Sequence, residues 1–76
     1  MKIHKYKKYP PMKIVATWSN GTTHTETDFD DYADLAESVS AYRNIFNSKT
    51  ECRSGTLTGY TVYIGTTATE KNGKKI

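Results

Sequence analysis

Lysine side chains crowd both ends of this 76-residue chain, with tyrosines between them at the N-terminal end, and these residues are its first candidates for chemistry. An ammonium group can neutralise a phosphate and an aromatic ring can stack on a base, so this mixture suits contact with a nucleic-acid strand. The candidate contacts for a nucleic acid or another partner are Lys2, Lys5, Tyr6, Lys7, Lys8, Tyr9, Tyr63, Lys71, Lys74 and Lys75. A solvated, flexible terminus is the competing interpretation of the same residues.

The remaining reactive side chains give little support for catalysis. His4, His24 and the single cysteine, Cys52, lie far apart in the sequence, without the spacing of metal ligands. Cys52 could act as a nucleophile only if folding brought His24 beside it. We therefore expect no enzyme activity, no metal site and no cofactor.

An acidic cluster precedes and opens the best helical segment. Its members are Asp28, Asp30, Asp31 and Asp34. Capping of a helix accounts for them, and a calcium-binding loop would require a glycine that this stretch lacks. Across the whole chain the net charge of +3 hides basic ends around an acidic body, a split that matters for partner choice.

Residues 30–47 carry the only clear helical period. Apolar side chains recur there every three or four residues, which is the spacing of a stripe that packs on a core. The stripe consists of Tyr32, Leu35, Ala36, Val39, Tyr42 and Phe46. Asp30 is the expected N-cap, because its carboxylate can accept the first free backbone N–H groups.

Residues 12–29 predict a β-hairpin, because Asn20-Gly21 separates two stretches of strand-forming residues. A two-residue type I′ turn at this dipeptide pairs Trp18 with Thr23 and Lys13 with Asp28. In this register the face away from the helix carries Lys13, Val15, Thr17, His24, Glu26 and Asp28. The threonine-rich second strand suits the edge of a sheet.

The most apolar strand is predicted over residues 60–67, in the middle of the sheet. Residues 58–64 resemble the aromatic strand of RNA-recognition domains, although they lack its leading basic residue and the chain lacks that fold's second helix. A turn and a short strand are expected around residues 51–54. Asn72-Gly73 is a second possible hairpin turn, and a frayed basic tail is the alternative there.

These elements predict one α+β domain, in which a single amphipathic helix covers one face of an antiparallel sheet in the order β-β-α-β(-β). The expected division is a basic arm over residues 1–11, the domain over 12–69 and a basic tail over 70–76. The sequence has no apolar stretch suited to a membrane span or a signal peptide, so we expect a cytoplasmic protein.

Two functions follow from the sequence. The first is a non-catalytic protein-binding module, such as an inhibitor, an antitoxin-like blocker or a phage accessory protein that blocks a host factor. The alternative is nucleic-acid binding through the lysine-rich ends. A homodimer through a sheet edge or an uncovered sheet face is also expected, because unpaired strand edges favour pairing with another chain.

Overall fold

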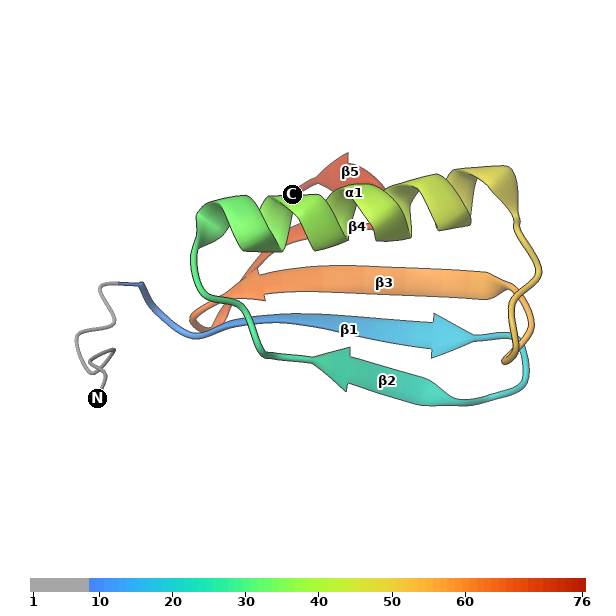
Figure 1. Ribbon diagram of the computed structural model, residues 1–76. Coiled ribbons are helices and arrows are strands. Elements are labelled where there is room, and N and C mark those ends of the chain that lie inside the picture. The colour runs from blue at the N-terminus through green and yellow to red at the C-terminus, as the bar shows by residue number, and fades with distance from the viewer. Residues whose placement is uncertain (1–8) are drawn as a thin grey trace.

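Alternating apolar residues in two strands and one apolar helix stripe produce the predicted α+β architecture (Figure 1). The computed structural model describes residues 9–76. Its elements are β1 (Met12–Trp18), β2 (Thr23–Glu26), α1 (Tyr32–Ser48), β3 (Leu57–Ile64), β4 (Thr67–Lys71) and β5 (Lys74–Lys75). The strands form one antiparallel sheet in the order β2-β1-β3-β4-β5, so β3 is central and β2 is an edge, as predicted.

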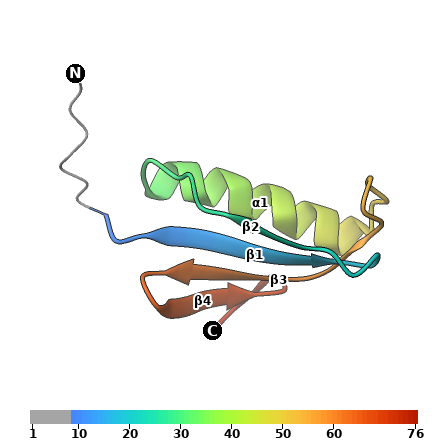
Figure 2. The same cartoon turned by 90° about the horizontal axis from the view of Figure 1, so that it is seen from below.

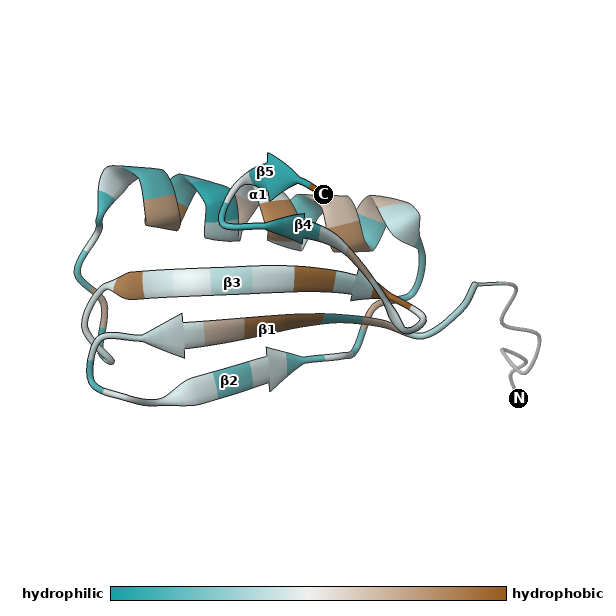
Figure 3. Ribbon diagram, turned by 180° about the vertical axis from the view of Figure 1, so that it is seen from behind, coloured by the Kyte–Doolittle hydropathy of each residue, from teal (hydrophilic) through white to brown (hydrophobic). Residues whose placement is uncertain are grey.

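The core lies between α1 and the two most apolar strands. Figure 3 shows hydrophobic residues concentrated in β1, β3 and the helix, while β2, β4 and β5 are polar. The buried apolar side chains are Met12, Ile14, Ala16, Phe29, Leu35, Val39, Leu57, Tyr60 and Val62. Figures 1 and 2 together place α1 on one face of the sheet, and no helix or strand of residues 9–76 covers the opposite face, which we call the uncovered face.

The helix begins one residue later than predicted. Asp31, not Asp30, is the N-cap, and its carboxylate accepts the Asp34 backbone N–H at 2.8 Å. The Asp34 carboxylate accepts the N–H of Asp30, the residue before the N-cap, at 3.0 Å, so Asp34 fixes the chain that enters the helix. The expected stripe is also narrower, because Tyr32 is 46% exposed and packs edge-to-face against Tyr9 instead of the core.

The predicted register of the first hairpin is wrong by one residue. Ala16 pairs with His24, where a two-residue turn would have paired it with Thr25. The turn has three residues: the Gly21 N–H donates to the Trp18 carbonyl at 2.9 Å, and Trp18 N–H donates to Thr22 at 2.9 Å. Only Gly21 has a positive φ, whereas a type I′ turn needs two such residues.

The extra turn residue exchanges the two faces of β2. His24 and Glu26, predicted to point away from the helix, lie on the helix side with their partners Ala16 and Ile14. The predicted Lys13–Asp28 pair does not form, since β2 ends at Glu26 and Lys13 lies opposite Tyr63 of β3.

The C-terminal end is part of the sheet. The strand predicted over residues 60–67 ends at Ile64, because Gly65 with φ +65° turns the chain back into β4. Residues 70–76, expected to form a tail, instead complete β4 and add β5. Asn72-Gly73 forms the type I′ turn between them, with φ values of 52° and 86°.

The segment after the helix is a turn without a strand. Cys52 and Gly55 exchange two backbone hydrogen bonds, of 2.8 and 3.0 Å, and form only an isolated bridge. Gly55 has a φ of +100°, which L-residues rarely adopt, and its backbone lies against the Ser19 side chain. This turn ties the end of the helix to the first hairpin.

Candidate functional site: the lysine face of the sheet

The uncovered face of the sheet gathers basic and aromatic side chains from four strands. Because alternate residues of a strand point to opposite faces, the burial of Ile14 and Val62 under the helix fixes which residues point away from it. The site residues on this uncovered face are Lys13, Tyr63, Lys71 and Lys74. We call this set, with the small and polar residues between its members, the lysine face.

Strand pairing brings the members of the lysine face next to one another. Lys13 lies directly opposite Tyr63, and its Nζ stands 5.0 Å from the centre of the tyrosine ring. Lys71 lies opposite Thr61 on one side and Lys74 on the other. All three lysines are exposed, whereas Tyr63 is half-buried among its neighbours. Like charges directly opposite one another destabilise a sheet, so the Lys71–Lys74 pair favours an anionic ligand.

No strand residue on the lysine face is acidic within the described part of the chain. The other paired strand residues on this face are uncharged: Val15, Thr17, Thr23, Thr25, Gly59, Thr61 and Ala68. The carboxylates of the strands, Glu26 and Glu70, both lie on the helix side, and the acidic cluster Asp30, Asp31, Asp34 lies in and before α1. The two sides of the sheet therefore differ in charge, which steers anions to the uncovered one.

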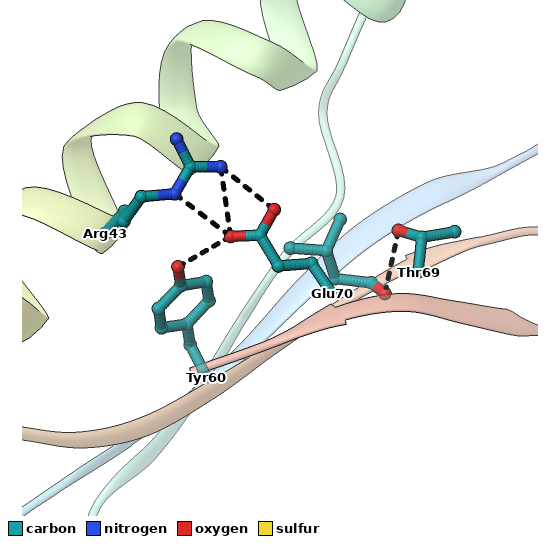
Figure 4. Close-up of polar contacts among 5 residues, drawn as sticks. Arg43, Tyr60, Thr69 and Glu70 are labelled. Carbon is teal, nitrogen blue, oxygen red and sulfur yellow. Dashed lines mark hydrogen bonds and ion pairs between the residues drawn. The ribbon is translucent and has the colours of Figure 1, made fainter. Parts of the chain in front are cut away.

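On the helix side, Glu70 joins β4 to the helix and to β3 (Figure 4). Its carboxylate accepts hydrogen bonds from Arg43 at 2.9, 3.1 and 3.2 Å and from the Tyr60 hydroxyl at 2.8 Å. Burial alone would raise the pKa of Glu70, but the hydrogen bonds from Arg43 and Tyr60 outweigh it and hold the pKa below its usual value. Burial and the same carboxylate raise the pKa of Tyr60 to about 12.

The cluster of Arg43, Tyr60 and Glu70 lies on the helix side of the sheet, but it positions residues of the lysine face on the other side. Glu70 is directly followed by Lys71, so the ion pair that holds Glu70 under the helix points the next side chain outward. Asn72 adds a second restraint: its side-chain oxygen accepts the Tyr60 backbone N–H at 2.8 Å, and its own N–H donates to the Tyr60 carbonyl at 2.9 Å. The turn that carries Lys71 and Lys74 is therefore fixed to β3.

A second polar contact crosses the opposite flank of the helix. The Tyr42 hydroxyl donates to Glu26 of β2 at 3.1 Å, and burial together with this carboxylate raises the pKa of Tyr42 to about 12. Beside this contact a groove of about 230 Å³ runs between α1 and the edge strand. It is lined by Trp18, Glu26, Ser38, Ala41, Tyr42 and Ile45.

The structure brings together only some of the candidate contacts predicted from sequence. Tyr63, Lys71 and Lys74 share the lysine face, but Lys75 points to the helix side, where it acts on the Glu70 charge. Tyr9 packs on Tyr32 at the start of α1, with ring centres 4.7 Å apart. The candidates Lys2, Lys5, Tyr6, Lys7 and Lys8 lie outside the described residues.

Sequence reasoning missed Lys13, Arg43, Tyr60 and Glu70. The predicted hairpin register places Lys13 opposite Asp28, and the predicted C-terminal tail includes Glu70. One signal could have identified Glu70: it stands between threonines and a type I′ dipeptide, Asn72-Gly73, which predicts a strand before the turn.

The residues considered for other chemistry are separated in the fold. Cys52 lies in the turn after α1, where it is exposed, and His24 lies in β2. Among residues 9–76, no group of three histidine, cysteine or acidic side chains is arranged to hold a metal ion. Within the same residues, α1 does not combine the length and apolar character that crossing a membrane requires.

Similarity to known proteins provides no parallel for the lysine face. Comparison of this chain with known protein families, with curated proteins and with solved structures finds no match.

Proposed function

We propose that the protein is a non-catalytic module that binds single-stranded nucleic acid on the lysine face. The observation that carries the proposal is that three exposed lysines and Tyr63 share one face of the sheet, on which none of the strand residues that the structure describes is acidic. This is the second of the two functions expected from sequence; it keeps Tyr63, Lys71 and Lys74 of the predicted contacts and adds Lys13.

In this proposal the lysines contact phosphates and Tyr63 stacks on a base. Lys71 and Lys74 flank one turn and contact neighbouring phosphates, which removes the repulsion between their two ammonium groups. Tyr63 offers its ring to a base, and stacking of this kind contributes about 1–3 kcal/mol per base. In the free protein Lys13 covers that ring at 5.0 Å, a contact worth about 0.5–1 kcal/mol at an exposed site, and it moves to a phosphate when a base arrives.

The shape of the site favours a single strand over a duplex. The grooves of a duplex admit a helix or a two-stranded ribbon, and a sheet of five strands is too broad to enter either of them. An unpaired strand can instead lie flat on the sheet, with its bases turned to the protein surface and its phosphates toward the lysines. The neutral threonines between the lysines accept bases of any sequence, so we expect little sequence preference.

Binding of labelled single-stranded oligonucleotides, followed by fluorescence anisotropy over a range of salt concentrations, tests the proposal. The combined variant Lys13→Ala, Lys71→Ala and Lys74→Ala removes three phosphate contacts, so the slope of log affinity against log salt should fall by about 2 units. Lys75→Ala is the matched control for the single variant Lys74→Ala, because each removes one charge beside the same turn, the first from the helix side and the second from the lysine face.

The proposal also makes a prediction for Tyr63. Tyr63→Leu should weaken binding about tenfold or more without changing the salt slope, whereas Tyr63→Phe should retain the stacking and the affinity. Absence of binding at low salt, or an equal loss in Lys75→Ala and Lys74→Ala, would refute the proposed function. Competition by polyglutamate as strong as competition by the oligonucleotide would instead support the first expectation, a protein-binding module with an acidic partner.

A further inference from the structure

The edge of the sheet at β2 has the features of an interface, and it is distinct from the lysine face. The two edge strands differ in how well they are protected against pairing with another chain. β5 consists of two lysines, which discourage strand pairing, whereas β2 (Thr23–Glu26) contains no lysine, proline or bulge. Figure 2 views the sheet from the β2 side, where this strand lies nearest the viewer.

Hydrogen bonding within the first hairpin determines which β2 groups point outward. The Trp18 N–H donates to the Thr22 carbonyl, so Thr22, His24 and Glu26 direct their backbone groups toward β1. The alternate residues Thr23 and Thr25 therefore direct their N–H and C=O groups away from the sheet. Within residues 9–76, no backbone bond to these outward groups of Thr23 and Thr25 is present.

We infer that β2 pairs antiparallel with β2 of a second copy, with the two-fold axis passing through Thr25. Thr25 then exchanges two backbone hydrogen bonds with its own counterpart, and Thr23 pairs with Thr27 of the other copy. The axis is perpendicular to the sheet, so both helices lie on one side and both lysine faces on the other. Two-fold symmetry of this kind is the commonest arrangement of protein dimers.

Charge selects this register among the possible ones. With Thr25 on the axis, His24 of each copy lies directly opposite Glu26 of the other, on the helix side, at both ends of the seam. An axis through His24 would oppose the two imidazoles, and an axis through Glu26 would oppose two carboxylates. The strand is therefore self-complementary in one register only.

The groove beside β2 gives the opposing histidine a place to lie. Glu26 lines this groove together with Trp18 and Ile45, which are only partly buried in the single copy. Its Oε1 accepts the Tyr42 hydroxyl, which leaves Oε2 for the imidazole of the second copy. A seam built on a four-residue strand is small beside the roughly 1,200–2,000 Å² of stable interfaces, so the dimer should be weak and concentration-dependent.

Sedimentation equilibrium of the full chain, over a wide concentration range, tests the inference. The wild-type protein should pass from monomer to dimer mass. Thr25→Pro removes the central outward N–H without touching the bonds to β1, and it should weaken association about tenfold or more. Thr25→Val is the matched control: it keeps that N–H and should dimerise like the wild type.

A charge exchange tests the register independently of proline. His24→Glu alone opposes carboxylates across the seam and should be monomeric, whereas Glu26→His alone removes the carboxylate that faces His24 and should associate more weakly than the wild type. An equal mixture of the two should form a heterodimer, because each Glu then faces a His. A wild-type protein that stays monomeric at every concentration, a dimer that Thr25→Pro leaves unchanged, or a mixture that does not associate would overturn the inference.

Discussion

Glu70 shows how one side chain can carry several structural tasks at once. It is the one charged or polar residue among the described ones that is buried, with 6% of its surface exposed. A lone buried carboxylate would be costly, but Arg43 and Tyr60 supply four hydrogen bonds to it. The cluster joins the helix, β3 and β4, and the residue that follows Glu70 belongs to the lysine face.

The first prediction concerns replacement of this carboxylate. Glu70→Gln keeps the shape of the side chain but removes its charge, and we expect a loss of about 1–2 kcal/mol of unfolding free energy near neutral pH. The value lies at the low end for charged hydrogen bonds because the Arg43 side chain is 42% exposed and can turn to water. Urea denaturation of wild type and variant gives the difference.

The pH dependence of that difference has a definite sign. The folded protein holds the pKa of Glu70 below its ordinary value of 4.5, so the stabilisation is fully present above that value. It is lost as the pH falls through the folded-state pKa, where the carboxylate of the wild type becomes protonated. The gap between wild type and Glu70→Gln should therefore shrink in acid, and a gap that stays constant down to about pH 2 would contradict this account.

At the scale of elements, one dipeptide has two different outcomes in this chain. Asn72-Gly73 forms the type I′ turn that its sequence predicts, whereas Asn20-Gly21 belongs to a three-residue turn with one positive φ. The difference lies in long-range contacts. Ser19 N–H donates to the Thr56 carbonyl at 2.8 Å, and the Ser19 hydroxyl accepts the Thr56 N–H at 2.9 Å, so the segment 54–56 fixes the first turn from outside.

This difference limits what the sequence could predict. Apolar alternation in Met12–Ala16 and Tyr60–Ile64, and the helical stripe around Leu35 and Val39, correctly predicted β1, α1, the central strand β3 and the core between them, but not β4 and β5. Those signals are local. The register of β2 depends on contacts made 37 residues away by Ser19, and the one-residue shift exchanged the predicted faces of His24 and Glu26. The contact of Lys13 with Tyr63 was not predicted because it joins β1 to β3, which β2 and α1 separate in the sequence.

The two Asn-Gly turns also give a matched pair of substitutions. Asn72→Ala places alanine at φ 52° and removes the acceptor of the Tyr60 N–H, so we expect a loss of about 1–3 kcal/mol. Asn20→Ala removes only an exposed bond of 2.9 Å to the Thr22 N–H and should cost less than about 0.5 kcal/mol. Thermal and urea unfolding of both variants provide the measurement, and equal losses would show that the second turn does not hold β3.

Asn72→Ala should affect binding as well as stability. Lys71 and Lys74 lie on either side of this turn, so a loosened turn separates two of the three lysines of the lysine face. Under conditions where the variant remains folded, its affinity for single-stranded oligonucleotides should fall, while Asn20→Ala binds like the wild type.

For the whole molecule, the arrangement of surfaces joins the proposed function to the inferred dimer. The helix and the strand carboxylates Glu26 and Glu70 lie on one side of the sheet, and Lys13, Lys71 and Lys74 lie on the other. A two-fold axis perpendicular to the sheet preserves this division, so dimerisation would extend the lysine face from five strands to ten without burying any of its lysines. A strand long enough to cross the seam could then contact both copies.

Oligonucleotide length therefore distinguishes the monomer from the dimer. A short strand of about 6–8 nucleotides fills one lysine face, whereas one of about 30 nucleotides can occupy both, and linked binding of this kind raises the affinity by about 100-fold or more. Thr25→Pro should abolish the advantage of the long strand, while its affinity for the short strand should equal that of Thr25→Val. The combined lysine variant should weaken both. If Thr25→Pro lowers the affinity for the short and the long strand equally, the substitution damages the lysine face itself, because Thr25 lies on that face. Thr25→Val separates the two effects, because it changes the same side chain but keeps the N–H.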